Sequence, residues 1–284
     1  MYLNHWRLRR RPFVNSNDLS FLLYAKGHFE VLIRLLCAVD ASAGVGLLTG
    51  ENGCGKTYLA SKLCRELGDH GHETCLIGAP DPEPARFLRQ VLAELEPRVG
   101  HGGPGADPFR ELRYAALDNL HRGLRTVIVI DDAQLVRGDD LFAEIGRIRS
   151  LEENGRTLIT TILIGDHALR QRISKLPFLW QRLDAVAELQ PLEDADAFFY
   201  IAHRLSVAGQ TGTIFTEAAL RKIIAFSRGI PRVINGICDL ALLIGFGERA
   251  KLVDLGIVRE AIREYTQVRG LAPAAAAEEI SHKT

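Results

Sequence analysis

The sequence predicts an α/β fold, with a parallel sheet covered by helices on both faces, followed by a smaller all-helical region. Up to about residue 191, short β-prone runs alternate with helical patterns or loops, and beyond Pro191 only helical patterns remain. Strands that alternate with helices favour a parallel sheet whose two faces are buried. The composition of 284 residues, 47% hydrophobic and 25% charged, is that of an ordinary globular chain with one large or two modest domains.

The expected strands and helices follow from the spacing of hydrophobic residues and from the glycines, prolines and capping residues at their ends. The expected strands are 45–49, 73–77, 126–130, 158–164 and 185–189. The first expected helix begins at Lys56, and four more follow near 193–209, 216–227, 231–247 and 253–265. Thr216 is placed to cap the second of these four, Gly229 follows its end, and Pro231 occupies the first turn of the next.

These elements divide the chain into four parts. We expect an N-terminal segment (1–13), a phosphate-binding α/β domain (14–191), a helical domain (192–266) and a disordered tail (267–284). Glycines and prolines crowd residues 97–108, which we interpret as a surface loop.

Charge and cysteine content exclude several classes. Lys plus Arg and Asp plus Glu are equal at 35 each, so no whole-molecule field attracts nucleic acid or an anionic membrane, and any such binding must be local. The 5 cysteines contain no C-x-x-C pair, which argues against a disulfide framework or zinc ribbon. No run approaches the ~18 apolar residues of a membrane span. We expect a cytoplasmic protein without an integral membrane segment.

The strongest chemical signal is Gly50-Glu-Asn-Gly-Cys-Gly-Lys-Thr57, which matches G-x-x-x-x-G-K-[ST] in full between an expected strand and an expected helix. In that context, backbone N–H groups and the helix N-terminus surround phosphate oxygens. Lys56 is expected to neutralise the β- and γ-phosphates of ATP, and the Thr57 hydroxyl to bind Mg²⁺. The residues expected to contact nucleotide are Gly50, Asn52, Gly53, Cys54, Gly55, Lys56, Thr57 and Tyr58.

A second signal is the strand 126–130, which ends in Asp131 and Asp132 and has the pattern of a Walker B strand. We expect Asp131 to hold Mg²⁺ through water and Asp132 to polarise the water that attacks the γ-phosphate. Many P-loop ATPases carry Glu at the second position. Because Asp is one methylene shorter, a slow ATPase that acts as a switch remains an open interpretation.

Seven further motifs together point to a known protein family. Met1-Tyr-Leu-Asn-His-Trp6, Leu48-Thr-Gly-Glu51, Ile130-Asp-Asp-Ala-Gln134, Leu163-Ile-Gly165, Gln181-Arg182, Leu189-Gln-Pro-Leu192 and Gly229-Ile-Pro-Arg-Val-Ile-Asn235 occur in that order. In this respect the chain resembles the AAA+ ATPases of the ExeA/GspA (general secretion pathway protein A) type over about residues 1 to 265. The resemblance implies a three-layer P-loop sandwich with a helical lid. It also implies Mg²⁺-dependent ATP hydrolysis coupled to self-assembly and to assembly or remodelling of a partner complex, with secretion as one such role.

The resemblance also implies roles for two arginines. Arg232 resembles the sensor 2 arginine of the lid, which reaches the γ-phosphate, and Arg182 resembles the arginine finger that completes a neighbouring subunit's site in a ring or filament. An ordinary helix N-terminus for Arg232 and a surface ion pair for Arg182 remain alternatives. The sequence departs from the family at Asp166, where an acidic side chain would repel a γ-phosphate and leaves sensor 1 unassigned. Thr160 or Thr161 could substitute only if the strand register allows.

Two other interpretations stay open. One is a DNA-binding regulatory ATPase similar to the TniB/MuB transposition helpers, using a local basic run of Arg7, Arg9, Arg10 and Arg11 on duplex DNA. For that run we favour a solvated segment that packs Trp6 and Phe13 on the core. The other is a nucleotide-sensing adaptor that hardly hydrolyses ATP. The spacing of His70, His72 and Cys75 fits no common metal site.

Overall fold

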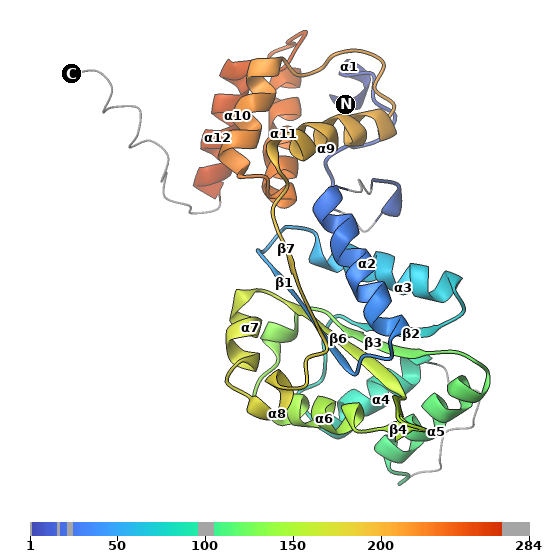
Figure 1. Ribbon diagram of the computed structural model, residues 1–284. Coiled ribbons are helices and arrows are strands. Elements are labelled where there is room, and N and C mark those ends of the chain that lie inside the picture. The colour runs from blue at the N-terminus through green and yellow to red at the C-terminus, as the bar shows by residue number, and fades with distance from the viewer. Residues whose placement is uncertain (1, 16–17, 22–24, 96–104, 269–284) are drawn as a thin grey trace. The chain divides into compact units, whose positions relative to one another are not determined.

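The computed structural model describes residues 2–15, 18–21, 25–95 and 105–268, so the expected tail and most of the expected glycine-rich loop lie outside the described residues. The chain forms two compact units, each with its own core (Figure 1). One is an α/β unit, Lys26–Gln190. The other is helical and combines Met1–Ala25 with Pro191–Thr284.

The α/β unit contains a five-stranded parallel sheet in the order β2-β3-β6-β1-β7. Its strands are β1 (Val45–Gly50), β2 (Glu73–Ile77), β3 (Thr126–Ile130), β6 (Ile159–Gly165) and β7 (Ala185–Leu189). Every residue of β1, β3 and β6 is buried, which explains why these strands appear in the sequence as unbroken apolar runs. The expected parallel sheet is confirmed.

Helices cover the sheet on both sides and make three layers (Figure 1). One layer holds α2 (Lys26–Asp40) and α3 (Lys56–Asp69). The other holds α4 (Pro84–Leu95), α5 (Pro108–His121), α6 (Asp140–Arg149), α7 (His167–Ile173) and α8 (Pro177–Trp180). Val45 and Leu47 point from β1 into the core beneath α4 to α8, where Phe87 and Phe142 are fully buried. A short hairpin of β4 (Glu152–Glu153) and β5 (Arg156–Thr157) precedes β6.

The helical unit contains α9 (Asp194–Val207), α10 (Glu217–Ser227), α11 (Pro231–Gly247) and α12 (Leu255–Val268), together with α1 (Tyr2–His5) and a 3₁₀ turn at Leu19–Phe21. The expected cap is present, since the Thr216 hydroxyl accepts from the Ala219 N–H at 3.3 Å. Gly229 has φ of 72° and a Cβ there would lie 1.9 Å from the Leu192 carbonyl oxygen, so only glycine fits. Among the described helices, none is long and apolar enough to cross a membrane.

The N-terminal boundary differs from the expected division, because residues 14–25 group with the helical unit and not with the α/β unit. Contacts of residues 14–25 with the helical unit explain the difference, because Arg204 donates to the Val14 carbonyl at 2.7 Å and lies 4.7 Å over the Phe21 ring, and Ala25 belongs to the helical core. The preceding residues pack there too, as expected for Trp6 and Phe13. Trp6 and Phe13 are 6% and 3% exposed within the helical core, and the Trp6 indole donates to the Leu242 carbonyl at 2.9 Å. The segment therefore supplies part of the core that α9 to α12 would otherwise lack.

A buried arginine fastens this segment to α9. Arg204 is 6% exposed and donates to the carbonyls of Pro12 at 2.6 Å and Val14 at 2.7 Å, and to the Tyr200 hydroxyl at 2.8 Å. Tyr200 in turn donates to Asn235 on α11 at 3.0 Å. Burial raises the pKa of Tyr200, so the phenol stays protonated as this donor requires. The guanidinium group thus donates to two backbone carbonyl oxygens as well as to the Tyr200 hydroxyl.

We predict that Arg204→Met lowers the free energy of unfolding of the helical unit by about 3 kcal/mol, because two backbone carbonyls lose charged donors in a buried site. Urea unfolding followed through Trp6 fluorescence in a Trp180→Phe background measures this unit alone, since the chain has 2 tryptophans. Arg263→Met, an exposed arginine on α12, is the matched control. Equal unfolding midpoints for the two variants would show that the network does not stabilise the segment.

Candidate nucleotide-binding site

The Walker A residues form a loop between β1 and α3. Gly50 ends β1, where a Cβ would lie 2.5 Å from the Leu189 carbonyl oxygen of β7. Gly53 and Gly55 adopt φ of 96° and 101°, in the left-handed region that glycine allows. Gly55 also occupies the N-cap of α3 and supplies no side-chain acceptor, so the first N–H groups of this helix have no side-chain cap. The loop and helix together present backbone donors suited to an anion.

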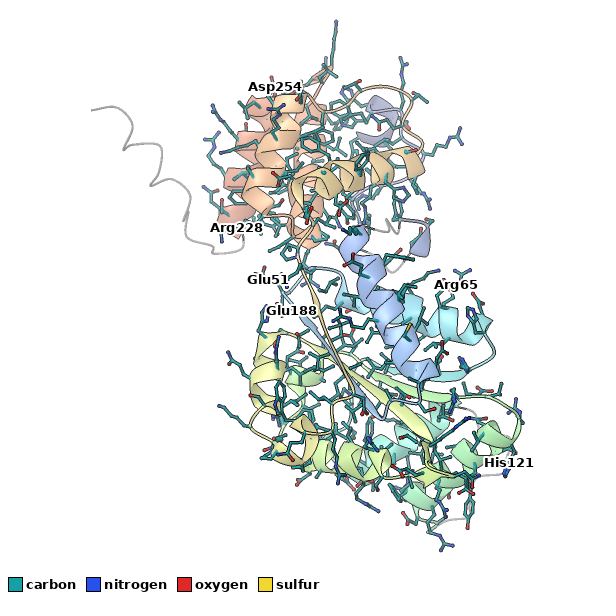
Figure 2. All side chains as sticks on the ribbon, in the orientation of Figure 1. Glu51, Arg65, His121, Glu188, Arg228 and Asp254 are labelled. Atoms are coloured by element: carbon teal, nitrogen blue, oxygen red, sulfur yellow. The ribbon has the colours of Figure 1, made fainter. Side chains whose placement is uncertain are left out.

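The Lys56 side chain folds back onto the Walker A loop. It is 6% exposed, and its ammonium group donates to the carbonyls of Gly50 at 2.9 Å and Glu51 at 3.0 Å. Glu51 itself lies exposed in the loop (Figure 2). Burial lowers the pKa of Lys56, while the nearby acidic groups, Asp131 and Asp132 among them, act in the opposite direction. Among the described residues, the hydrogen-bond partners of the ammonium are therefore these two neutral carbonyls alone.

A histidine that sequence reasoning missed supports the loop from α2. His28 Nε2 lies 3.0 Å from the Cys54 carbonyl, and because a carbonyl only accepts, Nε2 is the donor. Cys54 itself is fully buried, and its burial, together with the negative charge of Glu51, raises the pKa of its thiol to about 11. No motif in the sequence links residues 28 and 54, because their contact is made only when α2 packs against the loop.

The Walker B carboxylates follow β3 as expected. Asp131 is 4% exposed, and its Oδ1 accepts from the Asp132 N–H at 3.0 Å. Asp132 has φ of 49° in the left-handed region, and its Oδ1 accepts from the Gln134 side-chain amide at 2.9 Å. The charges of Asp132, Asp166 and Asp131 all raise the pKa of Lys56, against the larger effect of burial, so three carboxylates act on this one buried ammonium.

Asp166 has a structural role that the sequence did not reveal. Its Oδ1 accepts from the N–H groups of Ala168 at 2.9 Å and Leu169 at 3.2 Å, so it caps the N-terminus of α7. Asp166 therefore presents a negative charge near Lys56 that is already engaged in capping.

The strand register rules out the two threonines that were considered for sensor 1. Thr160 and Thr161 pair with Val127 and Ile128 in the first half of β3, whereas the Walker residues follow the strand ends. The Thr160 hydroxyl instead donates to the Ala43 carbonyl at 2.6 Å, on the opposite edge of the sheet. Neither hydroxyl lies at the carboxyl edge, so neither replaces a sensor 1 residue.

The described residues also supply oxygen donors of the kind Mg²⁺ prefers. Thr57 in the first turn of α3 is exposed, and Asp131 directly follows β3. A hydroxyl and a carboxylate fit an ion that keeps several waters and takes few protein ligands. Among the described residues there is no cluster of three or more His, Cys, Asp or Glu side chains for another metal. His72 Nδ1 accepts from the Arg125 N–H at 3.2 Å, so this nitrogen is occupied by a hydrogen bond. The three residues His70, His72 and Cys75 therefore do not form a set of metal ligands.

The two arginines implied by the resemblance lie in different units. Arg182 follows α8 in the α/β unit, and Arg232 lies in the first turn of α11 in the helical unit. Both side chains are exposed, and within the described part of the chain neither has an ion pair. A surface ion pair, the alternative for Arg182, is therefore not present in this structure.

Comparison with known proteins matches this architecture. The AAA domain family model matches residues 39–173. The chain is 32% identical over 272 residues to general secretion pathway protein A of Aeromonas hydrophila, an alignment that covers 95% of this chain and 49% of the relative. The chain thus spans about half the length of that relative.

Solved structures with the same fold are more distant in sequence. The Aeropyrum pernix ORC2 protein in its ADPNP-ADP complexes has a TM-score of 0.66 and 17% identity, covering 92% of this chain and 74% of that one. Drosophila ORC bound to DNA has a TM-score of 0.65 and 18% identity, covering 92% and 66%. At these identities the likeness concerns the fold alone. Together with the Walker loop geometry, the comparisons show that the chain belongs to the AAA+ family of P-loop ATPases and is of the general secretion pathway protein A type.

Proposed function

We propose that the protein binds ATP with Mg²⁺ and hydrolyses it at the edge of the sheet where β1, β3 and β6 end. The observation that carries the proposal is the buried Lys56, which is held by two loop carbonyls and lies within the electrostatic influence of Asp131, Asp132 and Asp166. A buried ammonium without an ion pair is costly, and a polyphosphate chain would supply the missing negative charge. The three carboxylates would repel the phosphates, and a bound Mg²⁺ would offset that repulsion.

The residues divide the chemistry between them. Backbone N–H groups of the Walker A loop and α3 bind the phosphate oxygens, and Lys56 moves from its two carbonyls to the β- and γ-phosphates. Thr57 and Asp131 hold Mg²⁺, which neutralises charge that develops on the phosphates. Asp132 orients and polarises the attacking water, and Gln134 fixes the carboxylate through its amide. Asp132 is shorter than the usual Glu, which supports a slow turnover.

Nucleotide state is proposed to act on assembly through the two exposed arginines. Arg232 lies at the N-terminus of α11 in the lid and is the residue proposed to sense the γ-phosphate. Arg182 is the residue proposed to enter a neighbouring subunit's site, which makes hydrolysis depend on a ring or filament. The similarity to general secretion pathway protein A supports a secretion-related partner complex as the target of this assembly. We further propose that the protein acts in the cytoplasm.

Binding of duplex DNA is the second candidate function. The similar fold of Drosophila ORC, solved bound to DNA, favours it. The N-terminal basic run favours it less than the sequence suggested, because Arg10 pairs with Asp18 at 3.0 Å and Arg11 lies 3.8 Å from Asp239. Two of the four charges are thus partly neutralised within the protein.

We expect Lys56→Ala to abolish ATP binding and Mg²⁺-dependent phosphate release, because the only cation of the Walker loop is lost. Arg65→Ala, an exposed arginine on the same helix α3 (Figure 2), should leave both unchanged. Phosphate release is measured over a series of protein concentrations with and without duplex DNA. Hydrolysis that persists in Lys56→Ala would refute this site, and strong stimulation of the wild-type protein by DNA would favour the second function.

Cys54 provides a test through pH. Because its thiol pKa is about 11, we expect its alkylation by iodoacetamide to be slow at pH 7 and to rise about tenfold per pH unit toward pH 11. ATP should slow it further, and a protein fully modified at Cys54 should no longer bind ATP. Peptide mass spectrometry resolves each site, and the exposed Cys37 serves as the internal reference. Full ATP binding after complete Cys54 modification would contradict the proposed loop contacts.

A shared site predicts complementation. Arg182→Ala should bind ATP without hydrolysing it, and Lys56→Ala should do neither. An equal mixture should recover roughly a quarter of the wild-type rate, since half of the subunits keep Lys56 and half of their neighbours keep Arg182. The rate of phosphate release measures this recovery, with each variant mixed with itself as the control. A mixture as inactive as its components would show that Arg182 does not act between subunits.

A further inference from the structure

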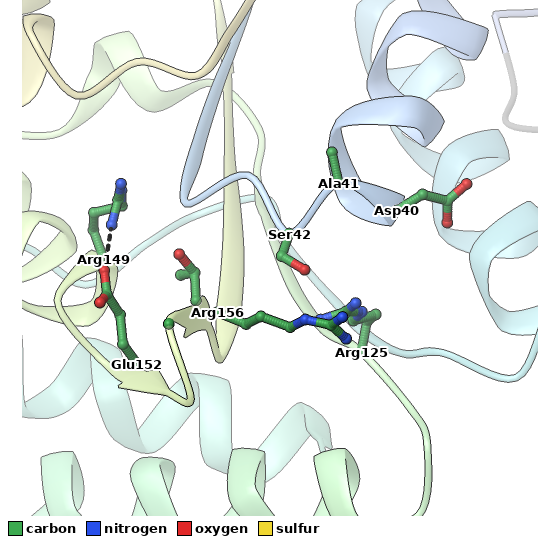
Figure 3. Close-up of a pocket in the computed structure, with 9 residues that line it drawn as sticks. Asp40, Ala41, Ser42, Arg125, Arg149, Glu152 and Arg156 are labelled. Atoms are coloured by element: carbon green, nitrogen blue, oxygen red, sulfur yellow. Dashed lines mark hydrogen bonds and ion pairs between the residues drawn. The ribbon is translucent and has the colours of Figure 1, made fainter.

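A polar pocket opens at the opposite edge of the sheet from the Walker loop, within the α/β unit (Figure 3). It has a volume of about 530 Å³, which is in the range of small-molecule sites. Its walls come from the end of α2, the loop that leads into β1, the residue before β3, the end of α6 and the β4–β5 hairpin. The residues that carry the argument are Asp40, Ser42, Arg125, Arg149, Glu152 and Arg156.

One of the three arginines is already neutralised. Arg149 donates to Glu152 at 3.2 Å, and its Nε lies 3.6 Å from Asp184. Its side chain packs so closely on Gly44 that a Cβ there would lie 1.7 Å from Cδ of the arginine. Asp184 also accepts from the Gly44 N–H at 2.7 Å. Arg149 therefore serves to hold the loop before β1, and its charge is not available to a ligand.

The other two arginines have no such partner. In the part of the chain that the structure describes, neither Arg125 nor Arg156 has a carboxylate within ion-pair distance. Arg125 is half-buried, and Figure 3 shows both guanidinium groups beside Ser42 at the same pocket. Two like charges that face one cavity repel each other, and an anion between them removes the repulsion while accepting several N–H donors.

We propose that this pocket binds the phosphate group of a small phosphorylated ligand, with Arg125 and Arg156 as the two guanidinium clamps and the Ser42 hydroxyl as a further donor. Arginine forks match the geometry of phosphate oxygens, and two forks with a hydroxyl suit one terminal phosphate. Asp40 stands exposed among the lining residues. Its charge repels the flanking phosphates of a nucleic-acid backbone, which favours a small ligand over DNA.

This pocket is separate from the nucleotide site. The two sites lie at opposite ends of β1, whose six residues span about 20 Å. The pocket uses no residue of the Walker loop, so its occupancy can be measured with the Walker site disabled. Ligand binding at this pocket therefore does not require ATP hydrolysis.

The test is calorimetric titration of the Lys56→Ala protein with inorganic pyrophosphate in the absence of Mg²⁺. We expect one site per chain, and we expect Arg125→Gln with Arg156→Gln in the same background to weaken it by at least about tenfold. Arg156→Gln alone, on the exposed hairpin, should weaken it less and guards against a folding defect, which circular dichroism also monitors. Arg113→Gln, an exposed arginine on α5 with the same change in charge, should bind as tightly as the parent.

Titration with AMP identifies the source of the phosphate. Tighter binding of AMP than of pyrophosphate would support a ligand whose phosphate is carried by a nucleoside, and tighter binding of pyrophosphate would support an inorganic phosphate. In both cases the affinity must fall in the double arginine variant. The absence of measurable binding for both probes, or equal binding by the parent and the double variant, would overturn the proposal.

Discussion

The parallel pairing of β1 between β6 and β7 is the constraint on which the rest of the α/β unit depends. Because all five strands run in one direction, the segments that follow β1, β3 and β6 emerge at one edge of the sheet. Residues that are far apart in the chain, Lys56, Asp131 and Asp166, meet there without any long insertion to carry them. The segments that precede the same strands gather arginines at the opposite edge. One sheet thus supports two polar regions of opposite chemistry.

Charge is distributed differently at these two edges. At the carboxyl edge, the charges of three carboxylates act on one buried ammonium, and a metal ion would offset their repulsion of a bound phosphate. At the amino edge, Arg125 and Arg156 have no ion pair among the described residues, and an anion would relieve their mutual repulsion. The net charge of zero conceals both imbalances, which shows that whole-chain charge says little about local recognition.

The sequence was sufficient for features that depend on local pattern. The central strands are buried on both faces and appear as continuous apolar runs, and the Walker glycines have a fixed spacing, so the sheet and the loop could be predicted. Features that depend on contacts between distant parts of the chain could not be predicted. The amphipathic α2 has no strong end signal, and its His28 meets Cys54 only through folding. In the sequence, Asp166 stands out only as an acidic residue near an expected phosphate. Its capping role depends on two N–H partners that the structure shows. Packing of Trp6 on the core was predicted and is confirmed, but its partner, the Leu242 carbonyl, is 236 residues away and could not be identified from a local pattern.

The assignment of residues 1–25 to the helical unit has a consequence for how that unit folds. The backbone passes between the units twice, once at Ala25–Lys26 and again at Gln190–Pro191, so the α/β unit is an insertion within the helical one. The helical core combines Trp6 from before this insertion with Leu242 from after it. It can therefore be completed only after the whole α/β unit has been synthesised.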